Sequence, residues 1–222
     1  MKKKLFIVFD GPEGGGKSTI IEKLRKYLQG QGYRVFTTKE PGGGDPVCVD
    51  IRKILLDPKH KGGFNKKTEL FLFCGDRAQH IEEVVKPVLE DLNVYENTIV
   101  LCDRFEAVMY AYQYFTRGAC TLDEFRLLNN YATGGLKPDF TFILDIDHKI
   151  GKMRNTKNGK KDRFEIEDPD FHNKAREGFK EYCRTELFPG TWMIVDASKN
   201  IEEVFEVIRD KFDELLRVRK AS

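Results

Sequence analysis

The sequence predicts an α/β fold, in which helices cover both faces of a parallel β-sheet. Short apolar runs rich in strand-forming residues recur along the chain, and longer segments with helical spacing of apolar residues lie between them. Most of these runs are continuously apolar, as expected for strands that are buried on both faces. Because strands that alternate with helices usually pair in parallel, the pattern favours a doubly covered parallel sheet.

The elements follow one another in a regular order. The runs expected to form strands are Leu5–Phe9, Tyr33–Thr38, Thr98–Cys102, Phe140–Leu144 and Trp192–Val195. After the first run, Ile20–Leu28 carries apolar residues at positions 20, 21, 24, 27 and 28, which lie on one face of a helix. The same spacing predicts helices over Leu70–Leu92 and Ile201–Leu216.

Length and composition indicate one globular domain over residues 1–222. The chain has 40% hydrophobic and 33% charged residues, with neither an internal repeat nor a low-complexity linker. Its 38 basic residues nearly balance its 36 acidic ones, which argues against a dedicated nucleic-acid-binding protein. A small anionic substrate needs only a local cluster of cations, so the balance does not exclude one.

The cysteines and the apolar segments bear on location. The five cysteines are odd in number and widely spaced, without a C-x-x-C pair, which favours reduced thiols in a cytoplasmic protein. The first apolar run, Leu5–Phe9, is too short for a signal peptide. No run approaches the roughly 20 apolar residues that span a bilayer, so we expect no contact with membranes.

The clearest motif is a phosphate-binding loop at residues 11–18. The segment GPEGGGKS fits G-x-x-x-x-G-K-[ST] at every fixed position, between an apolar run and an amphipathic helix. Glycines let successive backbone N–H groups turn toward phosphate oxygens, and the helix N-terminus adds partial positive charge. We expect Lys17 to reach the β- and γ-phosphates and the Ser18 hydroxyl to bind Mg²⁺. The loop therefore predicts a site for a nucleoside triphosphate.

A second group of residues suggests a site for an acceptor. Asp103 and Arg104 directly follow a buried run, and ligands of doubly wound sheets bind beyond such strand ends. A carboxylate there can hold the metal, and an arginine can grip a second phosphate. Phe73 and Arg77 are four residues apart on one helix face, a pairing that suits a nucleobase. In isolation, an aromatic such as Phe73 is more often a core residue, and an arginine such as Arg52 more often a surface charge.

One polar segment, residues 154–170, interrupts the alternation of strands and helices. It is basic in its first half and rich in turn-forming residues. It is either a solvated loop or a mobile lid, over about residues 154–165, whose cations close over bound phosphates. Arg154 and Arg163 are the arginines of this lid.

Taken in order, the motifs resemble those of the thymidylate kinase family. They are DGPEGGGKST (10–19), TKEPGGG (38–44), FLFCGDRAQH (71–80), DRFEAVMYAYQ (103–113), PDFTFILDID (138–147), DRFE (162–165) and VDA (195–197). The resemblance spans nearly the whole chain. It implies a P-loop kinase fold with a five-stranded parallel sheet, a closing lid and usually a homodimer. It also implies Mg²⁺-dependent phosphorylation of dTMP to dTDP by ATP.

The resemblance implies roles for individual residues. Those expected at the ATP site are Gly11, Pro12, Glu13, Gly14, Gly15, Gly16, Lys17, Ser18, Thr19, Asp196 and Ala197, the last two beside adenine. Those expected at the substrate site are Glu13, Glu40, Pro41, Arg52, Phe73, Arg77, Arg104, Val108, Met109, Tyr112 and Gln113. The expected catalytic residues are Lys17, Asp103, Arg104, Arg154 and Arg163, with Ser18 and Asp103 at the metal.

Within the expected substrate site, each part of the nucleotide has its own residues. Phe73 stacks on the base and Arg77 reads its edge, while Arg52 and Arg104 hold the acceptor phosphate. Glu40 and Pro41 shape the pocket. The residues expected beside the sugar are Glu13, which meets the 3′-hydroxyl, and Tyr112, which crowds out a ribose 2′-hydroxyl.

The sequence departs from the family pattern at positions that read the base and at a position that supplies a catalytic cation in some members. Val108 and Met109 stand where members commonly carry Ser or Asn, whose polar side chains help to read the pyrimidine. The substrate is therefore either dTMP or another deoxynucleoside monophosphate, such as dUMP, dCMP or a purine nucleotide. Gly14 stands where some members carry arginine, so the lid has to supply the catalytic cation, and the sequence leaves open which one.

A nucleotide-binding switch of the ATPase or GTPase type is a more distant alternative, because such switches share the phosphate loop. A GTP-binding switch would need an N-K-x-D motif after a later strand, and the sequence contains none.

Overall fold

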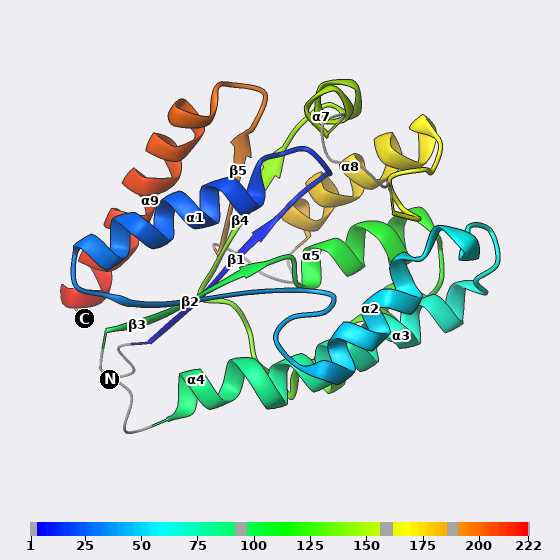
Figure 1. Cartoon of the computed structure of the whole chain (residues 1–222), viewed down its shortest axis with the longest axis horizontal. Coiled ribbons are helices and arrows are strands. Elements are labelled where there is room, and N and C mark those ends of the chain that lie inside the picture. The colour runs from blue at the N-terminus through cyan, green and yellow to red at the C-terminus, as the bar shows by residue number, and fades with distance from the viewer. Residues whose placement is uncertain (1–3, 92–96, 156–161, 186–190, 222) are drawn as a thin grey trace.

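A five-stranded, entirely parallel sheet forms the centre of the protein, with the strand order β2-β3-β1-β4-β5 (Figure 1). The structure is a computed structural model that describes residues 4–91, 97–155, 162–185 and 191–221. The strands are β1 (Leu5–Asp10), β2 (Arg34–Lys39), β3 (Thr98–Asp103), β4 (Phe140–Asp145) and β5 (Trp192–Asp196). Each begins and ends within one residue of its expected run, so the α/β prediction is confirmed.

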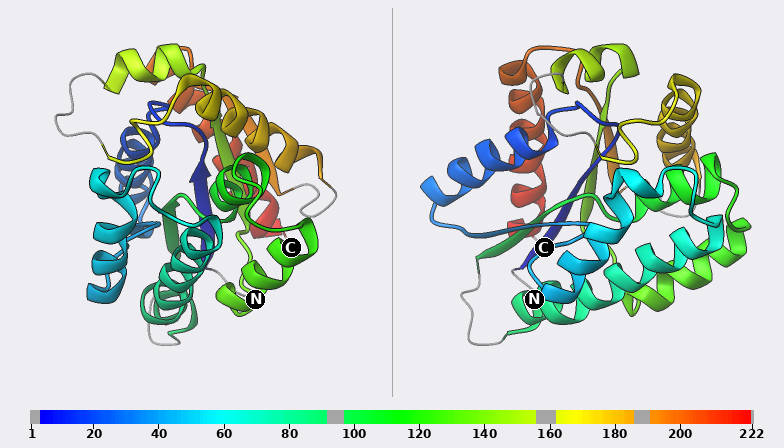
Figure 2. Two further views of the ribbon diagram at one scale, coloured as in Figure 1. Left: turned by 90° about the vertical axis from the view of Figure 1, so that its right-hand side faces the viewer. Right: turned by 45° about the vertical axis from the view of Figure 1, so that its right-hand side comes forward.

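Helices cover both sides of this sheet (Figure 2). They are α1 (Lys17–Gly30), α2 (Pro46–Leu56), α3 (Lys66–His80), α4 (Lys86–Glu90), α5 (Glu106–Met109), α6 (Leu122–Thr133), α7 (His148–Asn155), α8 (Pro169–Arg184) and α9 (Ile201–Ala221). No helix in the described ranges is long and apolar enough to cross a membrane.

The helix expected over Leu70–Leu92 consists of α3 and α4, which a wider π-helical turn at Ile81–Val85 joins. It begins at Lys66, four residues earlier than expected, because the Asn65 side chain accepts the Lys67 N–H and caps the first turn. The helical segment ends at Glu90, and position 92 lies outside the described residues.

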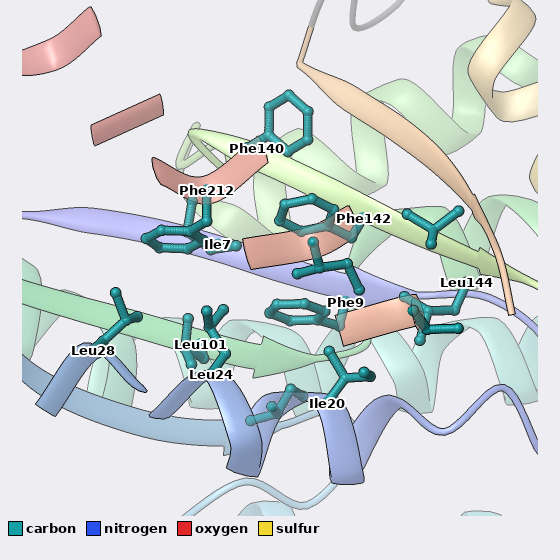
Figure 3. Packing of buried hydrophobic residues seen from close by; sticks show 14 of the residues in the cluster. Ile7, Phe9, Ile20, Leu24, Leu28, Leu101, Phe140, Phe142, Leu144 and Phe212 are labelled. Atoms are coloured by element: carbon teal, nitrogen blue, oxygen red, sulfur yellow. The ribbon is translucent and has the colours of Figure 1, made fainter. Parts of the chain in front are cut away.

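The core is divided by the sheet into two sides that follow the alternation along β1. Ile7 and Phe9 point toward α1 and α9, whereas Phe6 and Val8 pack against the segment that joins α3 to α4. Figure 3 shows the first side, in which the rings of Phe9 and Phe142 stack with centroids 5.3 Å apart. Residues of β3 and β4, the two strands beside β1, belong to the same cluster as Ile7 and Phe9.

The register of the sheet positions the loops that follow its strands. Phe9 of β1 lies level with Asp103 of β3, and Lys39 of β2 lies level with the same residue. From β1 the chain passes to β2 at one edge and then to β3, which lies between β2 and β1. It then crosses to β4 and β5 on the other side of β1. The phosphate loop thus opens at the point where the strand order reverses, the usual ligand site of such sheets.

We expect Phe142→Ala to lower the free energy of unfolding by about 3–5 kcal/mol, because the fully buried ring leaves a cavity between β4 and β1. Urea unfolding of the purified variant measures this loss. Val207→Ala, on the exposed face of α9, is the control and should change stability by less than about 0.5 kcal/mol. An equal loss in both variants would contradict the assignment of Phe142 to the core.

Candidate active site

A cavity of about 510 Å³ opens at the carboxyl ends of β1, β2 and β3. The sequence-predicted residues that line it are Glu13, Gly14, Gly16, Lys17, Ser18, Thr19, Glu40, Pro41, Arg52, Phe73, Arg77, Asp103, Arg104, Val108, Tyr112 and Gln113. The predicted residues that do not line it are Gly11, Pro12, Gly15, Met109, Arg154, Arg163, Asp196 and Ala197. Most residues expected at the donor and acceptor sites thus share one cavity.

The phosphate loop closes tightly around the start of α1. Lys17 Nζ donates to the backbone carbonyls of Gly11 and Pro12, at 3.0 and 2.8 Å. Burial of this amine lowers its pKa. Gly14 has a φ of 76°, and a Cβ there would lie 2.4 Å from the Cα of Gly151 in α7. The arginine that some family members carry at this position therefore has no room here while α7 packs against the loop.

Ser18 and Asp103 form a pair of oxygen groups beside the loop. The Ser18 hydroxyl donates to Asp103 Oδ2 at 2.8 Å, so a residue of α1 meets the end of β3. Hydroxyl and carboxylate oxygens are the ligands that Mg²⁺ prefers when it also binds phosphates and water. These two residues fit the expected magnesium site.

Arg104 joins the end of β3 to the phosphate loop. Its backbone N–H donates to the Phe9 carbonyl at 2.8 Å, and its guanidinium forms an ion pair with the Glu13 carboxylate. Burial opposes the charge of Arg104, but the nearby carboxylates, Glu13 first among them, outweigh it and raise the pKa. Its φ of 76° lies in the left-handed region, which is costly for a residue other than glycine. The structure thus holds a strained, charged arginine between the two halves of the cavity.

The far end of the cavity is aromatic and apolar with one buried cation. Phe73 and Arg77 both line it, as their spacing on α3 predicts, and the Phe73 ring lies 5.9 Å from that of Phe164. Val108 also faces the cavity. Met109 does not: it is buried behind the wall, with Sδ 3.3 Å from Arg77 Nη1. A flat, unsaturated ring fits this end chemically, with Arg77 as a hydrogen-bond donor at its edge.

The two residues expected beside adenine lie at the end of β5, next to the end of α7. Arg154 donates to the backbone carbonyls of Ala197, Ser198 and Lys199, at 2.6, 2.9 and 3.0 Å. Asp196 accepts from the Ser198 N–H and hydroxyl, which fixes the turn that presents these carbonyls. Arg154 therefore ties the first helix of the lid segment to the loop after β5.

Arg163, the second expected lid arginine, is only 2% exposed and faces away from the cavity. Its Nη1 donates to Glu69 Oε2 at 2.5 Å, and its Nε donates to the Leu55 carbonyl at 2.9 Å. Residues 156–161 of the lid lie outside the described residues, so its mobility stays a prediction. The described end of the segment is packed against α2 and α3 rather than solvated.

Comparison with known proteins agrees with this geometry. The family model described as "Thymidylate kinase" matches residues 9–208. The chain is 40% identical to the thymidylate kinase of Desulfovibrio desulfuricans, over 97% of this chain and 98% of the relative. It is also 40% identical to that of Caldicellulosiruptor saccharolyticus, over 99% and 100%. The chain belongs to the thymidylate kinase family.

A solved member of the family has the same fold. The crystal structure of thymidylate kinase from Ehrlichia chaffeensis superposes with a TM-score of 0.71 at 26% identity, covering 95% of this chain and 98% of the other. The expected P-loop kinase fold is thereby confirmed.

The cavity also contains residues that the sequence analysis did not assign to a site. They are Lys39, Leu56, Asp162, Phe164 and Glu165. Three of them belong to the DRFE motif that supports the family resemblance, from which only the arginine was chosen. The motif was the available signal, but the sequence alone does not show that its arginine turns inward while its neighbours face the cavity.

Asp10 is a further buried carboxylate beneath the cavity that the sequence analysis did not assign. Its Oδ2 accepts the backbone N–H groups of Phe105 and Val108, both at 3.1 Å. Asp10, the last residue of β1, thus caps the start of α5. Its Oδ1 has no hydrogen-bond partner among the described residues. Burial raises the pKa of Asp10 to about 6, although Arg104 acts in the opposite direction.

We expect Asp10→Asn to become more stable relative to the unsubstituted protein as pH rises from about 4 to about 6. The folded state holds the Asp10 proton more tightly than the unfolded state, so the unsubstituted protein loses stability over this window and levels off above it. The free energy of unfolding of Asp10→Asn minus that of the unsubstituted protein should rise by about 3 kcal/mol over this window. Urea unfolding at pH 4, 5, 6 and 7 measures it.

Asp123→Asn controls for the loss of one carboxylate, because Asp123 is on the surface. Its stability difference from the unsubstituted protein gives the baseline for removing a carboxylate at the surface. A change for Asp10→Asn no larger than this baseline would show that the carboxyl of Asp10 titrates alike in the folded and unfolded chains.

Proposed function

We propose that this protein transfers the γ-phosphoryl group of ATP to dTMP, yielding ADP and dTDP. The observation that carries the proposal is that one cavity unites the phosphate loop, the arginines Arg52 and Arg104, and the pair Phe73 and Arg77. Membership of the thymidylate kinase family supports the same reaction.

On the donor side, the phosphate loop binds the ATP phosphates through backbone N–H groups, with Lys17 beside the β- and γ-phosphates. Ser18 and Asp103 would hold Mg²⁺, which would supply positive charge to neutralise the donor phosphates. The loop after β5, with Asp196 and Ala197, binds the adenine.

On the acceptor side, Arg104 and Arg52 hold the phosphate of dTMP, and Phe73 stacks on thymine. Glu13 meets the 3′-hydroxyl of the sugar, and the buried ring of Tyr112 fills the space of a ribose 2′-hydroxyl. Because Arg104 pairs with Glu13, this contact positions the residue that binds the acceptor phosphate relative to the residue that binds the sugar.

The reaction needs alignment and charge neutralisation more than covalent catalysis. The acceptor is already an anion, so no strong general base is required, and the task is to bring two phosphate groups that repel each other into line. Lys17 and Arg104 supply positive charge in the cavity, and lid closure excludes water. Neither lid arginine lines the cavity, since Arg154 donates to three backbone carbonyls after β5 and Arg163 donates to Glu69. Of the two, Arg154 is the better candidate for the transferred group, because its partners are neutral carbonyls whereas Glu69 is a carboxylate.

A kinase for a different deoxynucleoside monophosphate is the second candidate, because the cavity wall presents Val108 where a polar base reader is common in the family. The relatives' names favour dTMP. The deciding experiment measures ADP release from Mg·ATP with dTMP, dUMP, dCMP, dGMP, dAMP and UMP offered singly. A clear preference for dTMP is the expected result, and preference for another base would reassign the substrate. If no monophosphate accelerates turnover, the proposed function is wrong.

The homodimer is also a proposal. Large apolar side chains are exposed on the neighbouring helices α3 and α6, with Phe71 59%, Leu127 70% and Tyr131 87% exposed. Such side chains are typical of surfaces that a second chain covers. Sedimentation velocity that shows only monomer at micromolar concentration would exclude it. The cytoplasmic location remains a prediction from sequence.

We expect Lys17→Ala to lower turnover with dTMP by at least roughly 100-fold, because it removes a preorganised charge at the transferring phosphoryl group. Steady-state ADP release measures the loss. Lys53→Ala, which removes an exposed lysine from α2, should retain normal turnover. Normal turnover in folded Lys17→Ala would be incompatible with the proposed role of the loop.

A further inference from the structure

The guanidinium of Arg77 is held from three directions, although it lines the cavity. Its Nε donates to Glu40 Oε2 at 2.9 Å, its Nη1 donates to Asn129 Oδ1 at 2.8 Å, and its Nη2 donates to the Phe105 carbonyl. Nη1 also lies 3.3 Å from Met109 Sδ. The side chain is 2% exposed, so these contacts rather than solvent set its orientation.

These contacts leave little of the arginine available to a ligand. Arg has five N–H groups in a fixed planar fork. Among the described residues, the partners of Arg77 engage the Nε group, both Nη1 groups and one Nη2 group. One N–H on Nη2 is left for a base in the cavity. A single donor recognises a base only if its direction is fixed.

Asn129 is the contact that links Arg77 to the rest of the core. It lies on α6, buried, and its Nδ2 donates to Glu106 Oε2 at 2.9 Å. Glu106 in turn accepts the Tyr182 hydroxyl at 2.8 Å through Oε1. Because Arg77 can only donate and an ionised Glu106 can only accept, the amide of Asn129 has one orientation that satisfies both. Asn129 thus stands between a buried cation and a buried carboxylate.

We propose that Asn129 is a positioning residue for base recognition, which holds Arg77 so that its remaining N–H meets an acceptor at position 4 of the pyrimidine. The proposal rests on the proposed function and names a determinant of its specificity. Without the amide, the attraction between Arg77 and Glu106 would draw the guanidinium away from the base.

The other residues around the base site offer few hydrogen bonds to a base, so base recognition depends on the orientation of the Arg77 guanidinium. Val108 at the cavity wall is apolar, and Met109 is buried behind it against Arg77. Gln113 lines the cavity too, but its Nε2 donates to Glu69 Oε1 at 3.0 Å. A carbonyl at position 4 accepts from Arg77, whereas an amino group there brings a second donor and loses the hydrogen bond.

The test compares dTMP with 5-methyl-dCMP, which share the sugar and the methyl group. Their bases differ at position 4, a carbonyl in thymine and an amino group in 5-methylcytosine, and at N3, which carries a hydrogen in thymine and a lone pair in 5-methylcytosine. The unsubstituted protein should prefer dTMP in kcat/KM by roughly 100-fold or more. Asn129→Leu should lower that ratio at least tenfold, about 1.4 kcal/mol, with an unchanged KM for ATP. Asn130→Leu, next to it on the exposed side of α6, is the matched control and should keep the ratio.

The conservative variant separates positioning from packing. Asn129→Gln keeps both the carbonyl oxygen that accepts from Arg77 and the amide N–H that donates to Glu106, and it should retain the preference for dTMP. Thermal unfolding of each variant checks that it is folded, and Asn129→Ala, which removes the same acceptor without added bulk, replaces Asn129→Leu if the latter does not fold.

A ratio in folded Asn129→Leu or Asn129→Ala equal to that of Asn130→Leu would overturn the proposal. The failure of the proposed function would look different, because the unsubstituted protein would then not phosphorylate dTMP at all.

Discussion

The in-register parallel pairing of β1 with β3 is the constraint on which the active site depends. It sets Phe9 level with Asp103, so the loop that follows β1 and the Asp103-Arg104 pair that follows β3 emerge side by side. A hydrogen bond from the Arg104 N–H to the Phe9 carbonyl extends the pairing by one residue beyond the strand. A slip of this register would separate the donor phosphates from the acceptor grip, even if every side chain of the site were retained.

Beneath this edge, buried polar groups hold the two sides of the cavity in place. Asp10 caps α5 from β1, and Glu40 after β2 binds Arg77 of α3. His80 lies between Glu40 and Thr38. Its Nδ1 is 2.9 Å from Glu40 Oε1, and its Nε2 is 2.7 Å from Thr38 Oγ1. Each of these groups would be costly to bury alone, because a charge in the interior needs a partner. The pairing of Glu40 with Arg77 therefore fixes the acceptor side by charge as well as by shape.

The sequence was sufficient to predict the strands, because a strand buried on both faces is a continuous apolar run, and such runs end where the sheet ends. It was not sufficient for α2, α5, α6, α7 and α8, which periodicity over the apolar residues did not reveal. The caps of three of them were visible in retrospect: Asp45 caps α2, Asp168 caps α8, and Thr121 with Glu124 forms a capping box at α6.

The same contrast applies to the site. Phe73 and Arg77 line the cavity because helical spacing alone puts them on one face. Met109 and Arg163 do not, because their directions depend on contacts with Arg77 and Glu69 that lie far away in the sequence. Local spacing predicts which residues share a face, whereas charge pairing across the core decides which of them reach the ligand.

The contact between Gly14 and Gly151 has a consequence for how the sequence can change. A Cβ at Gly14 would overlap the backbone of Gly151, and a Cβ at Gly151 would lie 2.4 Å from the Glu13 carbonyl oxygen. The phosphate loop and the helix that leads into the lid therefore touch through bare backbone, and neither position can acquire a side chain unless the other segment moves. An arginine in the loop and this placement of α7 therefore exclude each other.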